Sequence, residues 1–240
     1  MNISERMNNI FHKAGFHIYR YPNDNLRRKL QLMAEYQINK ILDVGANEGQ
    51  FAKDMRKLGF KGEIVSFEPL SSAYAKLCAN SRKDRKWAVH NCALGDEDTS
   101  GKINMAGNSY SSSILEMLET HINAAPESRY VGKEDVIIKR LDSLFEQFFC
   151  DNDNIMLKID TQGYEKHVID GAGNSLKKIR LVQLEASLVP LYHGELLLAE
   201  MIQYLEHKDF SLIAIESEFE NPLNHHLLQV NCIFLNNAAQ

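Results

Sequence analysis

Segments with strand character alternate with segments with helix character from residue 38 to residue 235, and this alternation restricts the fold more than any other feature. The expected strands are 38–44, 62–68, 86–94, 155–160, 179–185, 210–216 and 227–235, and the expected helices are 48–59, 71–81, 164–172 and 194–209. This order predicts an α/β fold with a mostly parallel sheet and helices on both faces. Only a loop joins the last two strands, so we expect them to form an antiparallel hairpin at one edge.

Two segments lie outside this alternation. Residues 1–37 are expected to form a helical arm, broken at the turn-forming sequence YPNDN, that packs against the main domain or forms part of a substrate lid. Residues 96–150 are an insertion between two central strands, and a segment of this length in a compact domain is usually functional. We therefore expect an arm at 1–37 and a main domain at 38–240 that carries the insertion at about 96–150.

Composition excludes several classes of protein. The chain has 240 residues and a net charge of −5, with acidic and basic residues interspersed, so a nucleic acid is not expected as the main partner. No apolar run approaches the roughly 18 residues that span a bilayer, and the N-terminus lacks the apolar core of a signal peptide, so we expect a cytoplasmic protein without a membrane span. Widely separated cysteines predict reduced thiols rather than disulfides or a metal site; they are Cys78, Cys92, Cys150 and Cys232.

Four of the expected parallel strands end in an acidic residue, namely Asp43, Glu68, Asp160 and Glu185. In open α/β sheets, ligands bind outside the carboxyl ends of the strands, near the point where the strand order reverses. We therefore expect the four carboxylates to line one edge of the sheet and to face a ligand. The alternative for each residue alone is a helix cap or a solvated turn residue.

The sequence DVGANEG, at the end of the first strand, indicates a backbone that turns sharply beside a ligand. Gly45 and Gly49 remove Cβ atoms from this turn, and a helix begins close by. The pattern is not the G-x-G-x-x-G signature of dinucleotide binding, because Asn47 stands where the second glycine would be. By itself, the glycine pair is equally consistent with an ordinary turn between a strand and a helix.

Glu68 indicates that the ligand contains a nucleoside. It lies 19 residues after Gly49, close to the offset at which an acidic residue accepts hydrogen bonds from ribose hydroxyls, and Pro69 stiffens the turn after it. Asp43 would repel a pyrophosphate but suits a cationic amino-acid group. A nucleoside joined to an ammonium and a sulfonium is S-adenosylmethionine, which we expect as the cofactor.

The chain resembles the FkbM-type S-adenosylmethionine-dependent methyltransferases, a family within the class I Rossmann-like group. The resemblance covers residues 38–235 and rests, in order, on ILDVGANEGQF, VSFEP, NCALGD, NSYSSSIL, LDSLF, LKIDTQGYEKHVIDGA, VQLEASLVPLYHGE and LLQVNCIFL. This chain departs from the family pattern at Gln162, where many relatives carry Glu, and at Asn231, where many carry Asp. Neither position can therefore have the role of an acid here.

The resemblance implies a seven-stranded sheet in the order 3-2-1-4-5-7-6, with the last strand antiparallel. It implies contacts to the methionine end of the cofactor from Asp43, Gly45, Asn47 and Gly49. Glu68 would bind the ribose. The backbone of Ala93 and Leu94 would flank the adenine, and Asp96 would reach its amino group. Family substrates are mostly hydroxyls of sugars and secondary metabolites, so the resemblance favours O-methyl transfer.

A sugar hydroxyl is a weak acid, so its methylation benefits from a base or a metal ion. Lys158 and Asp160 lie two residues apart on an expected central strand and so share a face, where burial would lower the Lys158 pKa enough for base chemistry. The alternative is a structural ion pair between them. Glu185 is a third candidate, or a cap, and His193 is a fourth, or a surface histidine. A magnesium ion bridged by the two acids is a further alternative, although we expect no metal.

Ser111, Ser112 and Ser113 lie in the insertion and either border the ligand pocket or form a polar loop. Taken together, these features predict a methyltransferase that acts on a hydroxyl of a sugar, a glycan or a secondary metabolite. One alternative is a noncatalytic module that binds a nucleoside cofactor. The other is a nucleotide-dependent oxidoreductase, against which the missing glycine and Asp43 both argue.

Overall fold

The computed structural model describes residue 11 and residues 21–150 and 152–238. The chain divides into two compact units, Met1–Glu35 and Tyr36–Gln240, and each is described by itself. In the first unit, helix α2 (Asp24–Glu35) begins within the predicted break, where the Asn23 side chain accepts a hydrogen bond from the Leu26 N–H at 2.9 Å and caps the helix. The helical structure expected before residue 21 lies outside the described residues, apart from residue 11.

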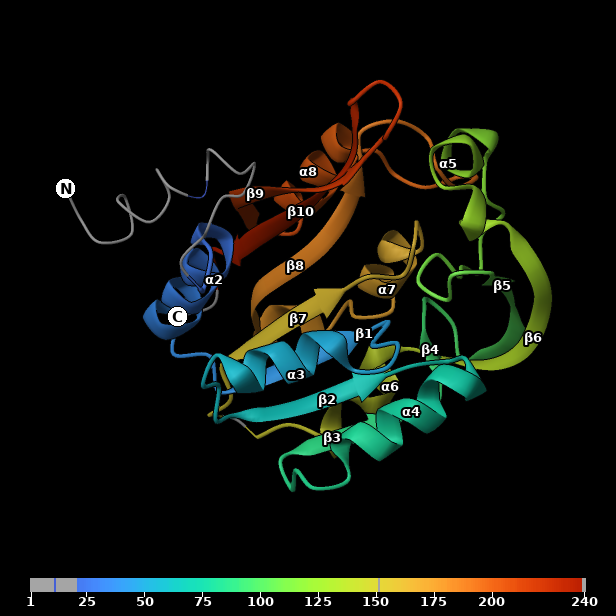
Figure 1. Cartoon of the computed structure of the whole chain (residues 1–240). Coiled ribbons are helices and arrows are strands. Elements are labelled where there is room, and N and C mark those ends of the chain that lie inside the picture. The colour runs from blue at the N-terminus through green and yellow to red at the C-terminus, as the bar shows by residue number, and fades with distance from the viewer. Residues whose placement is uncertain (1–10, 12–20, 151, 239–240) are drawn as a thin grey trace. The chain divides into compact units, whose positions relative to one another are not determined.

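The second unit is built on a seven-stranded sheet in the order β3-β2-β1-β7-β8-β10-β9 (Figure 1). Its strands are β1 (Lys40–Val44), β2 (Glu63–Phe67), β3 (Trp87–His90), β7 (Ile155–Ile159), β8 (Ile179–Ser187), β9 (Phe210–Glu220) and β10 (Leu227–Asn236). All neighbours are parallel except β10, which is antiparallel to both β8 and β9. Numbered along the chain within this sheet, the order is 3-2-1-4-5-7-6. The order implied by the resemblance and the hairpin expected at the edge are both confirmed.

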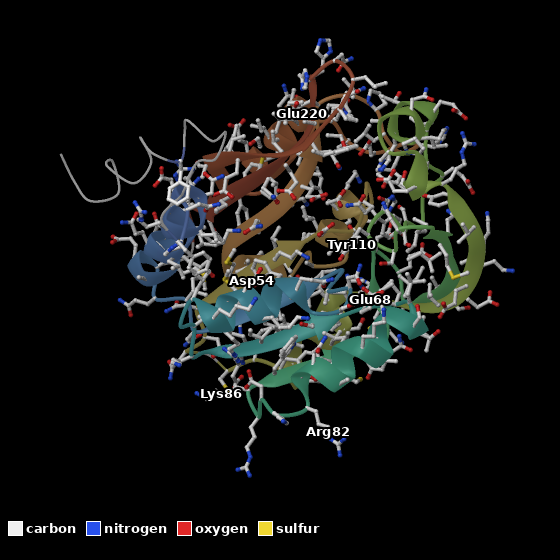
Figure 2. All side chains as sticks on the ribbon, viewed as in Figure 1. Asp54, Glu68, Arg82, Lys86, Tyr110 and Glu220 are labelled. Carbon is white, nitrogen blue, oxygen red and sulfur yellow. The ribbon has the colours of Figure 1, made fainter. Side chains whose placement is uncertain are left out.

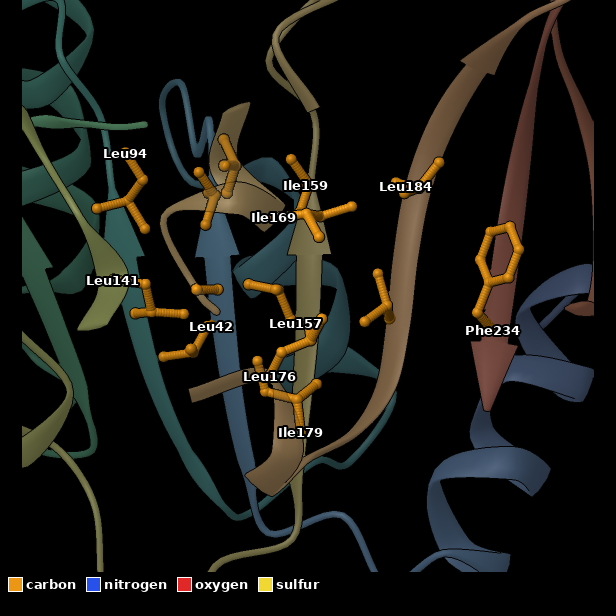
Figure 3. Close-up of a cluster of buried hydrophobic side chains, with 14 of the residues drawn as sticks. Leu42, Leu94, Leu141, Leu157, Ile159, Ile169, Leu176, Ile179, Leu184 and Phe234 are labelled. Atoms are coloured by element: carbon orange, nitrogen blue, oxygen red, sulfur yellow. The ribbon is translucent and has the colours of Figure 1, made fainter. Parts of the chain in front are cut away.

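The expected alternation of strands and helices is also confirmed, with helices α3 (Gln50–Lys57), α4 (Ser71–Ser81), α7 (Glu165–Asp170) and α8 (Leu198–Glu206). Alternate strand residues, such as Leu42 and Leu157, are fully buried in one apolar cluster with residues of α7, α8 and the short helix α6 (Leu141–Leu144) (Figure 3). Because side chains alternate along a strand, Asp43 and Lys158 face the other side of the sheet.

The insertion and the two-residue strand just before it form a second, three-stranded sheet in the order β4-β6-β5. Its elements are β4 (Ala93–Leu94), β5 (Thr99–Ala106), α5 (Glu119–Ala124) and β6 (Tyr130–Lys139), and the short 3-10 helices of the unit are η1 (Pro126–Ser128), η2 (Phe145–Gln147) and η3 (Ser175–Lys178). The strand expected at 86–94 is therefore wrong as a single element, because its start is β3 and its end is β4. The chain bends at Asn91, whose side-chain amide donates to the carbonyl oxygens of Glu68 (2.9 Å) and Pro69 (3.0 Å).

The four cysteines are unpaired; Cys92 and Cys232 are buried, whereas Cys150 is exposed. Across residues 21–150 and 152–238, the helices are too short or too polar to form a bilayer-spanning segment.

Candidate active site

The carboxyl ends of β1, β2, β7 and β8 share one edge of the main sheet, and the insertion lies beside them (Figure 1). Hydrogen bonds join the two parts. The Asn47 side-chain amide donates to the Ser109 carbonyl oxygen at 3.3 Å, and the Ser113 hydroxyl donates to the Gln162 carbonyl oxygen at 2.7 Å. The serine segment of the insertion therefore contacts the strand ends. That it borders a ligand pocket stays a prediction.

Gly45 and Gly49 are required by the packing of the chain on itself. Gly45 has φ +72°, and a Cβ atom there would lie 1.9 Å from the Asp160 carbonyl oxygen. Gly49 has φ +83°, and a Cβ atom there would lie 2.6 Å from the Trp87 ring. The loop after β1 is thus pressed against the loop after β7. This contact brings residues expected to bind the cofactor next to residues expected to bind the acceptor.

Asp43 and Lys158 form a buried ion pair between the neighbouring strands β1 and β7. Asp43 is fully buried, and its Oδ1 lies 3.1 Å from Lys158 Nζ in ion-pair rather than hydrogen-bond geometry. Asp43 Oδ2 accepts a hydrogen bond from Ser66 Oγ at 3.2 Å, and Ser66 Oγ accepts one from Trp87 Nε1 at 2.9 Å. Asp43 therefore supports the site from within the sheet. Its direct contact with the methionine end of the cofactor stays a prediction.

Lys158 is held from three directions. Besides its pairing with Asp43, it donates to the Gly45 carbonyl oxygen at 3.1 Å and lies 3.4 Å from Asp160 Oδ2. Burial acts to lower the Lys158 pKa, but the carboxylates of Asp43 and Asp160 outweigh burial and raise the pKa above its ordinary value. The direction of this shift is opposite to the lowering of the Lys158 pKa that the sequence led us to expect, and a catalytic role for Lys158 stays a prediction.

Glu68 follows β2 and is buried, with both carboxylate oxygens bound to backbone N–H groups. Oε2 accepts from Asn47 N at 2.8 Å, and Oε1 accepts from Leu70 N at 2.9 Å. Burial raises the Glu68 pKa to about 7, against the opposing effect of these two hydrogen bonds. Each oxygen keeps a second lone pair that a ribose hydroxyl can use. In Figure 2, Glu68 and Tyr110 lie on the side of the insertion.

The loop after β1 carries a further acceptor that suits the expected cofactor. The side-chain oxygen of Asn47 is buried and has no hydrogen-bond partner among the described residues. A buried acceptor without a donor costs free energy. Ribose hydroxyls and the ammonium group of S-adenosylmethionine are donors, so the acceptors of Glu68 and Asn47 fit this cofactor.

Ala93 and Leu94 are buried in β4, close in sequence to Asp96. Asp96 Oδ2 lies 3.0 Å from Nδ1 of His167 on α7, and the His167 ring stacks on Tyr164 with 4.2 Å between ring centroids. Nothing in the sequence around His167 indicates this pairing, because the two residues lie on different elements. Contacts of Ala93, Leu94 and Asp96 with the adenine stay predictions.

Asp160, Gln162 and Glu185 form one hydrogen-bonded cluster at the ends of β7 and β8. Gln162 Nε2 donates to Asp160 Oδ1 and to Glu185 Oε2, each at 3.0 Å. The Tyr192 hydroxyl donates to Gln162 Oε1 at 2.7 Å. The Gln162 side-chain amide thus lies between Asp160 and Glu185, where the sequence allowed a bridging magnesium ion as an alternative. The N–H groups of an amide do not bind cations. Sequence reasoning identified both acids but assigned no role to Gln162.

Glu185 belongs to the cluster, whereas His193 lies apart from it, and a catalytic role for Glu185 stays a prediction. Burial raises the Glu185 pKa well above its ordinary value, and the nearby Asp160 carboxylate adds to the rise. Glu185 is also partly exposed, so a ligand can reach it. His193 lies in an exposed loop, where its backbone N–H donates to the Glu116 carbonyl oxygen at 2.9 Å. A catalytic role for His193 stays a prediction without structural support.

The chain is similar to known proteins in both sequence and fold. Residues 43–212 match the family described as the methyltransferase FkbM domain. A relative named 2-O-methyltransferase NoeI, from Sinorhizobium fredii, is 27% identical over 205 residues, which are 81% of this chain and 82% of the relative.

Solved structures are similar to this chain as well. A candidate O-methyltransferase from Klebsiella pneumoniae has a TM-score of 0.50 at 13% identity, covers 99% of this chain and 91% of that chain, and shares the fold. A candidate tRNA methyltransferase from Streptococcus pneumoniae, solved with S-adenosylmethionine, has a TM-score of 0.47 at 12% identity, covering 89% of this chain and 74% of that chain. The family match spans the strand ends described above, and the chain therefore belongs to the FkbM family of S-adenosylmethionine-dependent methyltransferases.

Proposed function

We propose that this methyltransferase acts on a hydroxyl group of a sugar or glycan. The observation that carries the proposal is the pair of carboxylates, Asp160 and Glu185, which Gln162 holds together at the strand ends. A carboxylate accepts a hydrogen bond from a hydroxyl group and can take up its proton. The name of the Sinorhizobium fredii relative, a 2-O-methyltransferase, supports an oxygen acceptor.

Each residue of the site has a separate task in this proposal. S-adenosylmethionine supplies a methyl group that its sulfonium has already activated. Glu68 and Asn47 hold the nucleoside and the groups next to it. Asp160 orients the acceptor hydroxyl, and Glu185 accepts the hydroxyl proton as the oxygen attacks the methyl carbon. Lys158 Nζ lies 3.4 Å from Asp160 Oδ2 and holds this carboxylate in place.

The proposal is tested by methyl transfer from S-adenosylmethionine with a labelled methyl group to methyl glycosides, sugar nucleotides and small phenols. Mass spectrometry identifies the product. We expect a methyl ether on a sugar hydroxyl, with turnover lowered roughly 10²- to 10⁴-fold in Asp160→Asn and in Glu185→Gln. Glu146→Gln, at an exposed acid on η2, is the matched control and should keep full turnover. Methylation of nitrogen, or of phenols alone, would rule out a sugar hydroxyl as the acceptor.

A further inference from the structure

Gln162 is an uncharged residue in contact with two acids. Its side-chain amide donates to Asp160 on one side and to Glu185 on the other, and it accepts from Tyr192. A primary amide has two N–H groups to donate and one oxygen to accept with. Each N–H group therefore has its own carboxylate, and the oxygen has its own hydroxyl. No other uncharged side chain of this length offers two donors and an acceptor in one plane.

Only one orientation of the Gln162 amide satisfies these contacts. Turned over, the amide would point its oxygen at the two carboxylates and its N–H groups at Tyr192. The Tyr192 side chain is almost fully buried, at 1% exposed, and its hydroxyl lies 2.7 Å from Gln162 Oε1. The two carboxylates, which only accept hydrogen bonds, thus determine that the N–H groups face the acids, and the Tyr192 hydroxyl holds the oxygen at the other end.

The backbone holds Gln162 in place as well. Gln162 has φ +56°, a left-handed conformation that costs free energy in a residue with a Cβ atom. Its carbonyl oxygen accepts from Ser113 Oγ at 2.7 Å. A Cβ atom at Gly163 would lie 2.8 Å from the Tyr192 Cβ, so the chain passes directly against that ring. Contacts on several sides keep this strained residue at the strand ends, where such strain usually accompanies function.

We propose that Gln162 is a positioning residue that sets the separation and orientation of the Asp160 and Glu185 carboxylates toward the acceptor hydroxyl, and that the Tyr192 hydroxyl holds the oxygen end of the Gln162 amide in place. The inference rests on the proposed function, in which the two acids bind and deprotonate the acceptor. Because the Gln162 amide is neutral and donates to both acids, both carboxylates can lie close to the oxygen of one methyl-accepting hydroxyl group. A carboxylate at position 162 would place three acids together, and one of them would take up a proton.

Protonation of Glu185 reports on this arrangement, because several charges surround that carboxyl. Besides burial, the carboxylates of Asp160, of Glu218 on β9 and of Glu165 on α7 favour its protonated form, and Lys158 opposes them. Changes at Gln162 act on Glu185 at hydrogen-bond distance. Loss of the N–H donor removes a bond that favours the carboxylate, and a new carboxylate also adds repulsion.

The test is an NMR titration of the full chain, saturated with S-adenosylhomocysteine and labelled with ¹³C at the glutamate side-chain carboxyl groups. Loss of one signal in Glu185→Gln assigns Glu185. Gln162→Glu keeps the size of the side chain and the bond from Tyr192, and should raise the Glu185 midpoint by at least about one pH unit, a tenfold change in proton affinity. Gln162→Met should raise it by less.

Two variants separate positioning from a structural role. Tyr192→Phe keeps the buried ring but releases the amide, so the Glu185 midpoint should rise, by less than in Gln162→Glu. Ser113→Ala removes the bond to the backbone carbonyl of Gln162 without touching the amide, and the Glu185 midpoint should stay unchanged even if the melting temperature falls.

An unchanged Glu185 midpoint in Gln162→Glu, in protein that still binds S-adenosylhomocysteine, would overturn the inference. If that variant does not fold, an unchanged midpoint in both Gln162→Met and Tyr192→Phe would overturn it. The titration needs no acceptor. A shifted midpoint together with no methylation of any sugar would therefore refute the proposed function while leaving the positioning role of Gln162 in place.

Discussion

Replacement of Glu68 by alanine should abolish the pH dependence of cofactor binding together with much of the affinity. The Glu68 carboxyl has a pKa of about 7 because it is buried, although two backbone N–H groups favour its carboxylate. A carboxylate accepts hydrogen bonds from ribose hydroxyls more strongly than a carboxylic acid does. Cofactor binding at this site should therefore be linked to loss of the Glu68 proton.

The size of the effect follows from the Glu68 pKa. When only the carboxylate binds, the apparent Kd rises tenfold for each pH unit below the pKa of the free protein. With a pKa of about 7, affinity should fall about tenfold between pH 8 and pH 6, and about half a proton should be released per cofactor at pH 7. At pH 8, Glu68→Ala should weaken binding by roughly 1.5–3 kcal/mol, the cost of hydrogen bonds to a charged group.

Isothermal titration calorimetry with S-adenosylhomocysteine, from pH 6 to pH 8 in buffers of different ionisation enthalpy, measures both the affinity and the protons released. The matched control is Glu97→Ala, at an exposed acid that follows Asp96 in sequence, and it should keep the tenfold change. Constant wild-type affinity across this range would refute the linkage. A folded Glu68→Ala variant that keeps the tenfold change would assign it to another group and remove Glu68 from the ribose site.

The remaining predictions concern stability. In the folded protein the Glu68 pKa is raised from 4.5 to about 7, so the folded state binds this proton more tightly than the unfolded state does. As the pH falls from 7 to 4.5, the free energy of unfolding of wild type should therefore rise by up to about 3 kcal/mol relative to that of Glu68→Ala. Urea unfolding measures this difference. Lys158→Met leaves the Asp43 charge buried and unpaired and should cost about 3–5 kcal/mol, whereas adding Asp43→Asn should restore part of that loss. Additive losses in a double-mutant cycle would contradict a coupled pair. Gly45→Ala should destabilise the protein far more than Gly59→Ala, because both glycines have positive φ but only Gly45 would clash, with a carbonyl oxygen 1.9 Å from the new atom. Equal melting temperatures for these two variants would refute the packing argument.

The sheet and three of the acids at its edge could be predicted because their signals are local. Strand and helix patterns follow from the spacing of apolar residues within short windows, and parallel strands bring their carboxyl ends to one edge. Glu68, Asp160 and Glu185 therefore lie at that edge once the strands are placed. The split of the strand expected at 86–94 could not be predicted in the same way. It depends on hydrogen bonds from Asn91 to the turn after β2, which is formed by a distant part of the chain.

The charge of Lys158 shows a second limit of sequence reasoning. Burial in an apolar strand is visible in the sequence, and burial alone lowers the pKa of a lysine. The opposing effect comes first from Asp43, which is level with Lys158 on the neighbouring strand because of the register of β1 with β7, and then from Asp160, two residues further along the chain. The register therefore brings in the largest of the effects that raise the Lys158 pKa. The sequence predicts an unusual lysine, but the direction of its pKa shift cannot be read without this pairing of strands.

The two departures from the family pattern have one electrostatic consequence. Gln162 donates to Asp160 and Glu185, and Asn231, which lies opposite Glu185 in the pairing of β10 with β8, donates to Glu218 Oε2 at 2.6 Å. Each amide is a neutral donor beside acids, at a position where many relatives carry an acid. Like charges brought together in a partly buried site hold extra protons, because repulsion raises their pKa values. With amides at both positions, this edge of the sheet reaches its carboxylate form at a lower pH than it would with acids there. The base that we propose at Glu185 would therefore be available closer to neutral pH, and Gln162→Glu should move the pH profile of activity toward alkaline pH.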